Sequence, residues 1–300
     1  MAERKRKQPS RNEKEKAKTK GGSESECAAK CKQHVTTESR YFTCDQSHLQ
    51  PHLGELFFSH LQPHLGELFF SHLQPHLGEL FFSHLQPHLG ELFFRQPCVT
   101  LAKAFLGKVL VRRLDDGTEL RGRVVETEAY LGGEDKASHS AGGKRTRRNT
   151  AMFMKPGTIY VYPIYGVYLC MNVSSEGDGA AVLLRSLEPL QGHAVMRQLR
   201  ASKRKDGARP LKDKELCNGP SKLCQALDVQ RRLDRQDMAC HSEVWLEDTD
   251  SPPGVDEMVS APRVGIQSHG EWAKKPLRFY LRGNACVSVV NKEAERLCET

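Results

Sequence analysis

The folded part of the chain is marked by the way apolar and polar residues alternate from Arg95 onward. Short apolar runs are separated by turn-forming residues, and a few stretches have the apolar spacing of a helix. The predicted strands are residues 108–114, 120–130, 158–162, 167–173, 180–187, 277–282 and 286–290. The predicted helices are residues 101–110, 190–200 and 221–227, and the predicted surface loops are residues 203–209 and 248–262.

Most of these strands are joined by turns, which indicates the fold class. Asp-Asp-Gly at residues 115–117 is a hairpin signal, and Pro-Ile-Tyr-Gly at residues 163–166 joins a second strand pair. The pattern predicts one mixed α+β domain over residues 83–300, with a curved, largely antiparallel sheet, flanking helices and a protruding β-hairpin. Residues 1–46 are polar and carry 12 Lys/Arg against 7 Asp/Glu. They are predicted to form a disordered basic arm.

Between the arm and the domain, one 12-residue sequence occurs four times without change. Ser-His-Leu-Gln-Pro-His-Leu-Gly-Glu-Leu-Phe-Phe occupies residues 47–58, 59–70, 71–82 and 83–94. We interpret the first three copies, residues 47–82, as a spacer and the fourth as the start of the domain. Two histidines four residues apart, such as His48 and His52, suit a metal on a helix, but Pro51 between them opposes a helix. We therefore predict no metal site.

The net charge of +8 indicates a polyanionic partner, although a soluble protein can also be basic without one. Arg-Lys-Arg-Lys at residues 4–7 is typical of a nuclear-import signal or a non-specific DNA tether. The ten cysteines form no Cys-x-x-Cys pair, and the N-terminus lacks an apolar signal segment, which favours reduced thiols in a cytosolic or nuclear protein. No apolar run reaches the roughly 18 residues of a membrane helix.

Two carboxylates and a phenol are predicted to share one face of a strand. Side chains two residues apart point the same way in a strand, which aligns Glu126, Glu128 and Tyr130. Such a face either has a function or is simply the solvent-exposed side of an edge strand. Arg185 favours function, because a lone guanidinium in an apolar run needs a carboxylate or a bound anion.

A glutamate that faces an arginine across a cleft can deprotonate a water and stabilise a developing cation. Hydrolysis of an N-glycosidic bond has these requirements, since rupture of the bond leaves an oxocarbenium-like sugar. A plain buried ion pair is the structural alternative.

Tyrosines and basic residues follow in positions that suit DNA. Tyr160 and Tyr162 are predicted to share a strand face, whereas Tyr165 falls in the turn, where no core can hold it. An aromatic ring at a hairpin tip suits a wedge that unstacks bases, and a solvent-facing tyrosine stripe is the alternative. The basic loop 144–148 and a helix start at residues 221–222 suit phosphate groups.

Five ordered motifs resemble the alkyladenine (N-methylpurine) DNA glycosylases. They are Val-Glu-Thr-Glu-Ala-Tyr-Leu at 125–131, Met-Phe-Met-Lys-Pro-Gly-Thr at 152–158, residues 179–189, Asn-Gly-Pro-Ser-Lys-Leu-Cys at 218–224 and Pro-Leu-Arg-Phe-Tyr at 276–280. The resemblance covers residues 85–290. It implies a monofunctional enzyme of base excision repair that flips a damaged purine out of duplex DNA and hydrolyses its bond to deoxyribose.

The resemblance implies catalytic roles for three residues. Glu128 matches the general base that activates the water, Arg185 the side chain that helps to hold this water, and Val264 the residue whose backbone carbonyl does the same. Water rather than a lysine is the nucleophile in this family, so no strand cleavage follows. No metal or organic cofactor is implied. The implied substrates are duplexes that contain 3-methyladenine, 7-methylguanine, hypoxanthine or ethenoadenine.

The resemblance also implies a pocket for the flipped base. Tyr130, His139 and Tyr162 match the aromatic slot that sandwiches the base. Asn172 matches the side chain that obstructs the 2-amino group of guanine, and Tyr165 the residue that fills the vacated space in the duplex. The expected phosphate contacts are Thr146, Arg148, Ser221 and Lys222.

Two residues depart from the family pattern at the wedge. Pro163 stands where the family has an aliphatic residue, and Val167 stands where it has methionine. Both lie in the hairpin that is expected to enter DNA, so they bear on insertion rather than on the chemistry.

The expected partner is double-stranded DNA that contains damaged purines, and no membrane is expected. We expect a monomer in the nucleus, with the mitochondrion as a second location and repair proteins as candidate partners of the arm. The alternative function is a binding module that grips damaged DNA without cleaving it. A histidine-rich metal protein is a third hypothesis, which rests on the repeats alone.

Overall fold

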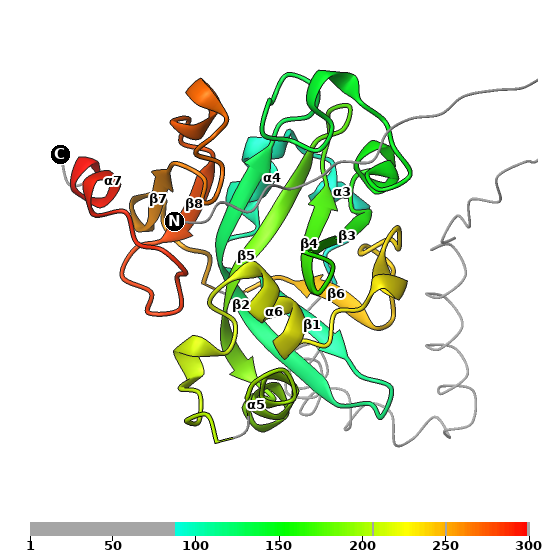
Figure 1. Ribbon diagram of the computed structural model, residues 1–300, viewed down its shortest axis with the longest axis vertical. Helices are drawn as coiled ribbons and strands as arrows, with labels where there is room; N and C mark the ends of the chain where they lie inside the picture. The colour runs from blue at the N-terminus through cyan, green and yellow to red at the C-terminus, as the bar shows by residue number, and fades with distance from the viewer. Residues whose placement is uncertain (1–87, 206, 250, 299–300) are drawn as a thin grey trace, which may run out of the picture. The chain divides into compact units, whose positions relative to one another are not determined.

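The computed structural model describes residues 88–205, 207–249 and 251–298. The predicted basic arm (residues 1–46), the predicted spacer (residues 47–82) and residues 83–87 lie outside the described residues. Figure 1 shows strands that lie side by side, with a few short helices around them. The predicted fold class, α+β with a largely antiparallel sheet, is confirmed.

The helices are α3 (Glu91–Phe94), α4 (Cys98–Ala104), α5 (His193–Ala201), α6 (Pro220–Ala226) and α7 (Lys292–Leu297). The strands are β1 (Val109–Arg113), β2 (Glu119–Tyr130), β3 (Ile159–Ile164), β4 (Tyr168–Ser174), β5 (Ala181–Gln191), β6 (Val244–Glu247), β7 (Met258–Ala261) and β8 (Arg278–Leu281). In the part of the chain that the structure describes, no helix has the length and apolar character needed to span a bilayer.

The eight strands form one sheet in which every named pair is antiparallel. The main order is β3-β4-β5-β2-β1-β6, while β8 pairs with β2 and with β7. β2 changes partner along its length, from β1 at residues 119–123 to β8 at residues 126–128. Register shifts against β5 flank Glu126, and such irregularities bend a strand. β2 is therefore an interior strand, and the alternative of a wet edge strand for Glu126 and Glu128 is wrong.

The main core lies between the central strands and the helices that pack on them. α4 leads into Phe105, whose side chain has no exposed surface. Residues 88–94, the end of the fourth repeat, join this core. The Leu89 N–H donates to the Leu246 carbonyl at 2.8 Å, and the ring centroids of Phe94 and Phe105 are 6.1 Å apart. The repeat sequence thus contributes to the fold in its fourth copy.

Short elements account for the differences from the sequence prediction. Residues 286–290, predicted to be a strand, form turns in which Cys286 and Val287 are buried without strand pairing. Residues 248–262, predicted to be a loop, contain β7, and the sequence pattern also misses β6. Both strands have only four residues, which is too few for alternation to stand out from a loop.

The helix predicted from residue 190 begins at His193, because β5 continues to Gln191. Gly192 joins the two elements at φ 85°, a conformation that side chains other than glycine rarely adopt. A Cβ at this position would lie 2.4 Å from Leu120 Cδ2. The close approach and the positive φ both require glycine here.

Candidate active site

A cleft of about 570 Å³ opens beside the C-terminal half of β2. β2 and β5 supply polar side chains to it, and the β3–β4 hairpin supplies aromatic ones. The predicted site residues that line it are Tyr130, His139, Tyr162, Tyr165, Asn172, Arg185, Ser221 and Val264. Among the described residues, no group of three or more His, Cys, Asp or Glu side chains is placed to hold a metal ion.

Glu128 lies behind the wall of this cleft with no exposed surface. Its Oε1 accepts a hydrogen bond from the Val264 N–H at 2.7 Å and lies 3.2 Å from a terminal nitrogen of Arg185. Its Oε2 accepts from the Tyr130 hydroxyl at 2.8 Å. A carboxylate offers about four acceptor positions, two on each oxygen. The position that remains is on Oε2, so Glu128 can accept from one further donor such as water.

Arg185 lies between two buried glutamates. Its Nε is 3.4 Å from Glu126 Oε1, in addition to the contact with Glu128. Glu126 also accepts from Arg278 and from the Ser288 N–H, each at 2.8 Å. Burial opposes the charge of Arg185, but the two carboxylates outweigh it and raise the pKa of the guanidinium. Arg185 thus has the carboxylate partners that the sequence predicts, and it reaches the cavity rather than lying sealed in the core.

Tyrosine rings form much of the cleft wall. Tyr160 and Tyr162 lie on one face of β3, with ring centroids 5.2 Å apart, as predicted. Tyr130 ends β2 and faces the same cavity. Burial, followed by the nearby charge of Glu128, raises the pKa of the Tyr130 hydroxyl well above its usual value. This hydroxyl therefore remains a hydrogen-bond donor to Glu128 at physiological pH.

His139 adds a neutral imidazole at the mouth of the cleft. Its ring meets Tyr162 edge-on, with centroids 4.6 Å apart and planes at 79°, and its Nδ1 lies 2.9 Å from the Tyr160 hydroxyl. The side chain keeps an exposed surface. Desolvation by neighbouring protein atoms, followed by the charge of Arg148, lowers the pKa of His139 to about 4. At physiological pH the ring therefore does not repel a cationic ligand.

Asn172, on β4, is fixed in the wall of the cleft. Its side chain is buried, and its Nδ2 donates to the Tyr160 carbonyl at 3.1 Å. The two residues are also direct partners across β3 and β4. This hydrogen bond gives the carboxamide a defined orientation, which a side chain that discriminates between ligands needs.

The β3–β4 hairpin ends in a strained tip. Tyr165 and Gly166 both have positive φ, 52° and 73°, and the Val167 N–H donates to the Ile164 carbonyl at 3.2 Å. This is the geometry of a type I′ turn. A bulky residue at positive φ is uncommon and is typically retained where strain serves a function. The Tyr165 side chain is 91% exposed, so the tip presents an aromatic ring to solvent.

The two departures from the family pattern leave the hairpin paired. β3 and β4 remain in register through Ile164 and Tyr168, beyond Pro163. β3 is an edge strand of the main sheet order, which is where proline is tolerated. Val167 is exposed at the tip, so both departures change the surface near Tyr165 without breaking the hairpin.

Comparison with known proteins assigns the family. The family model described as methylpurine-DNA glycosylase matches residues 92–285. The chain belongs to the methylpurine-DNA glycosylase family. It is 63% identical over 202 residues to the human protein named DNA-3-methyladenine glycosylase, and 62% and 61% identical over 206 and 207 residues to the mouse and rat proteins of that name. The alignments cover 67% of this chain and 68%, 61% and 64% of the three relatives.

Membership of the methylpurine-DNA glycosylase family places the chain among the DNA glycosylases, and the resemblance of its motifs to this class is confirmed. The chain spans less than two thirds of the mouse and rat relatives. The family match, residues 92–285, contains all residues that line the cleft.

Among the expected phosphate contacts of this methylpurine-DNA glycosylase, Ser221 alone lines the cleft. Arg148 is exposed, and its guanidinium lies 5.1 Å from the centroid of the Tyr162 ring. Thr146 and Lys222 are also exposed, and each donates a side-chain hydrogen bond to a neighbouring asparagine at 2.9 Å. These three side chains therefore lie outside the pocket, on the exposed surface.

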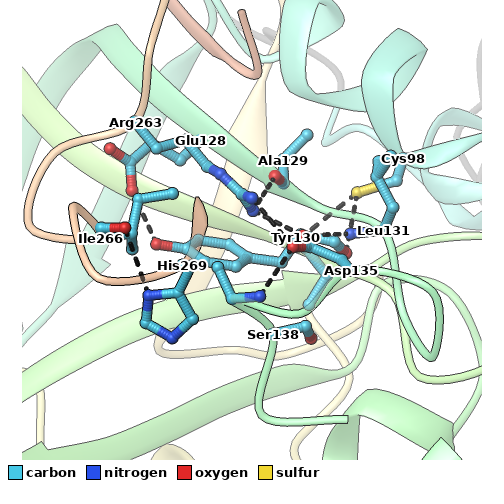
Figure 2. A network of polar contacts seen from close by, with 12 residues as sticks. Cys98, Glu128, Ala129, Tyr130, Leu131, Asp135, Ser138, Arg263, Ile266 and His269 are labelled. Atoms are coloured by element: carbon cyan, nitrogen blue, oxygen red, sulfur yellow. Dashed lines mark hydrogen bonds and ion pairs between the residues drawn. The ribbon is translucent and has the colours of Figure 1, made fainter. Parts of the chain in front are cut away.

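Two buried ion pairs at the site, Glu126–Arg278 and Asp135–Arg263, were not predicted from the sequence. Figure 2 shows the Arg263 guanidinium over the Tyr130 ring and bonded to Asp135. The two partners are 128 residues apart in the chain, and both lie in loops. The Val264 N–H, which donates to Glu128, was not predicted either, since the resemblance concerns only the carbonyl of that residue. The one signal for Arg263 is a lone charge among the apolar residues 261–266.

Proposed function

We propose that the chain is a monofunctional DNA glycosylase that hydrolyses alkylated or deaminated purines from duplex DNA. Its proposed substrates contain 3-methyladenine, 7-methylguanine, hypoxanthine or ethenoadenine. The observation that carries the proposal is Glu128, buried behind an aromatic cleft with Arg185 and Val264 as partners. The name shared by the human, mouse and rat relatives, DNA-3-methyladenine glycosylase, supports the substrate class.

In this proposal a water bound at Glu128 Oε2 is the nucleophile, and Arg185 and the Val264 carbonyl help to orient it. As the bond between C1′ and the purine nitrogen breaks, its electron pair leaves with the purine and the sugar becomes positively charged. The Glu128 carboxylate stabilises this charge, and it takes a proton from the water as the water oxygen attacks C1′. No protein atom bonds to the sugar, so the DNA strand stays intact.

The flipped base is proposed to stack between Tyr130 on one side and His139 and Tyr162 on the other. An electron-poor alkylated purine stacks strongly on such rings and is a good leaving group. Damaged base pairs also cost less to open, which adds selectivity before any contact forms. Tyr165, exposed at the hairpin tip, is proposed to occupy the space that the base leaves in the duplex.

A hypoxanthine-containing duplex tests this function. The full chain is expected to release free hypoxanthine, with strand breaks that appear only after treatment with alkali. Binding of this duplex in preference to an undamaged one without release of any base would identify the alternative, a binding module. Strand breaks without alkali would contradict a monofunctional mechanism.

Replacing Tyr165 by serine should lower activity most where the target base is well stacked. The change removes the ring at the tip and leaves the cleft intact. Base release from a paired hypoxanthine is therefore expected to fall more than release from a hypoxanthine in a bulge or mismatch. Single-turnover rates on the two duplexes measure the difference. An equal loss on both would point to a folding defect rather than to a lost wedge.

Replacing Asn172 by serine should relax selectivity against guanine. The proposed role of Asn172 is to crowd the 2-amino group, which guanine has and hypoxanthine lacks. Relief of one steric conflict between a side chain and a substrate group is typically worth about 1–3 kcal/mol. The rate of guanine release from a G·T duplex should therefore rise. The rate of hypoxanthine release from an I·T duplex should be largely unchanged. If the ratio of the two rates equals that of the parent chain, Asn172 is not the selectivity gate.

The proposed boundaries of the domain are tested by a chain that begins at Ser83. It should fold and release hypoxanthine, because it keeps the fourth copy of the repeat, whose residues 88–94 join the core. Its binding to undamaged DNA should be weaker and less sensitive to salt, because the cations of the arm are absent and no longer displace counterions from the DNA. An insoluble or inactive product would place the boundary elsewhere. A monomeric state, nuclear and mitochondrial location, and repair proteins as partners of the arm remain part of the proposal.

A further inference from the structure

Behind the aromatic wall lies a further buried ion pair, between Arg263 and Asp135, which takes no part in the chemistry proposed above. Arg263 and Asp135 have no exposed side-chain surface and meet through two parallel contacts, of 2.5 Å and 2.9 Å. Two parallel N–H···O bonds fix the guanidinium in position and in plane. The same guanidinium donates to the Ala129 carbonyl of β2 at 2.9 Å. Arg263 is therefore held rigidly against the end of the strand that carries the catalytic side chains.

Asp135 ties the loop that follows β2 to the same point. Its Oδ2 accepts from the Leu131 N–H at 3.1 Å, and its Oδ1 accepts from the Ala137 N–H at 3.0 Å. This loop continues to His139, which lies at the mouth of the cleft. Figure 2 shows Asp135 beside Arg263 and the Leu131 N–H, to which it is bonded.

Arg263 touches both parts of the site that Glu128 depends on. Its guanidinium lies 4.6 Å from the centroid of the Tyr130 ring, whose hydroxyl donates to Glu128. The next residue along the chain, Val264, supplies the N–H that donates to Glu128 from the other side. A shift of Arg263 would therefore move two of the donors of Glu128 together.

We propose that the Asp135–Arg263 pair is the positioning element of the active site. It fixes the Tyr130 ring, which stacks on the base, and the Val264 backbone, which orients Glu128 and its water. Neither side chain touches the reacting atoms. This inference rests on the proposed function. It assigns to the pair the role of setting the distance between the Tyr130 ring, which stacks on the base, and the Glu128 carboxylate.

Stability alone is a poor explanation of this pair. A buried ion pair contributes little relative to a well-packed neutral pair, since the loss of hydration offsets the attraction between the charges. The buried Nε of Arg263 also has no hydrogen-bond partner within the described part of the chain, which is itself unfavourable. A planar guanidinium offers what a neutral side chain cannot, namely a flat face for the Tyr130 ring and a fork for Asp135.

The test separates position from stability with a single and a double variant of the full chain. Arg263→Met leaves Asp135 buried without its partner, so the urea midpoint should fall. Adding Asp135→Asn removes the unpaired charge and should restore part of the midpoint, because the amide oxygen can still accept from one of the two backbone N–H groups that Asp135 binds. We expect single-turnover release of hypoxanthine at saturating protein to stay about 10- to 100-fold slow in both variants, because a displacement of about 1 Å at a catalytic site has an effect of this size.

Two further variants keep the test decisive. Arg263→Lys retains the charge but not the planar face or the fork, so it should fold and still release base slowly. Glu247→Gln is the matched control for stability. Glu247 is buried on β6, away from the cleft, and forms an ion pair with Arg121 that glutamine cannot make. This variant should lose stability while it keeps the parental rate.

Recovery of the rate together with the urea midpoint in the double variant would overturn the inference, and so would a parental rate in Arg263→Lys. If the parent chain itself releases no base, the proposed function fails instead. The two failures are thus distinguishable in one set of measurements.

Discussion

Replacing Glu128 by glutamine is expected to slow base release about 10²- to 10⁴-fold, the range typical of the loss of a general base. Glutamine has nearly the same shape as glutamate, but its amide cannot take a proton from the water or stabilise a positively charged sugar. The aromatic walls of the cleft are unaffected, so affinity for a lesion duplex should survive. Single-turnover release of hypoxanthine gives the rate, and titration of the same duplex gives the affinity.

The matched control is Glu188→Gln. Glu188 is a half-buried residue of β5 that lies 3.7 Å from Arg123 and does not line the cleft. Its variant should release base at the parental rate. Near-normal turnover by Glu128→Gln would show that another group is the base. A loss of lesion binding together with activity would show that the substitution had damaged the pocket.

Replacing Arg185 by methionine should lower the free energy of unfolding by about 3–5 kcal/mol, the usual result of breaking a buried ion pair by removing one partner. The site holds equal numbers of buried carboxylates and guanidinium groups, which are Glu126, Glu128, Asp135, Arg185, Arg263 and Arg278. Glu126 keeps Arg278 as a partner in the variant, but Glu128 stays buried and loses Arg185, the one cation that contacts it in the described part of the chain. Urea denaturation of both proteins at pH 7 measures the difference.

A second variant tests whether the lost charge is the cause. Arg185→Lys retains a cation near Glu128, so its stability should lie between that of the methionine variant and that of the parent chain. A methionine variant as stable as the parent chain would contradict a compensated charge cluster at this site.

The strand period of two was enough to predict which polar side chains of β2 act together. Glu126 and Glu128 both contact Arg185, and the Tyr130 hydroxyl donates to Glu128, so the three share one face as expected. Thr127 points the other way and donates to the Ala102 carbonyl of α4 at 2.8 Å. Local geometry alone sets this alternation. It could not show that β2 lies inside the sheet, because β5 and β8, which pair with β2 beside β1, are distant in the chain.

The features that escaped prediction depend on contacts between loops. A backbone donor such as the Val264 N–H leaves no trace in the sequence, since every residue but proline has one. Asp135 and Arg263 lie in separate loops, and no periodic pattern connects them. Residues 286–290 look like a strand because they are apolar, yet they bury Val287 in a turn whose next residue, Ser288, donates its N–H to Glu126. Apolar character predicts burial and not strand pairing.

Stopped-flow fluorescence on a duplex with one ethenoadenine would test the proposed mechanism most directly, because this base is fluorescent and its emission changes when it leaves the stack and when it is released. The full chain is expected to give a fast phase as the base enters the cleft and a slower phase that matches the appearance of free base. Glu128→Gln should keep the fast phase and lose the slow one. A slow phase of parental rate in this variant, or no fast phase in the parent chain, would contradict base flipping followed by hydrolysis at Glu128.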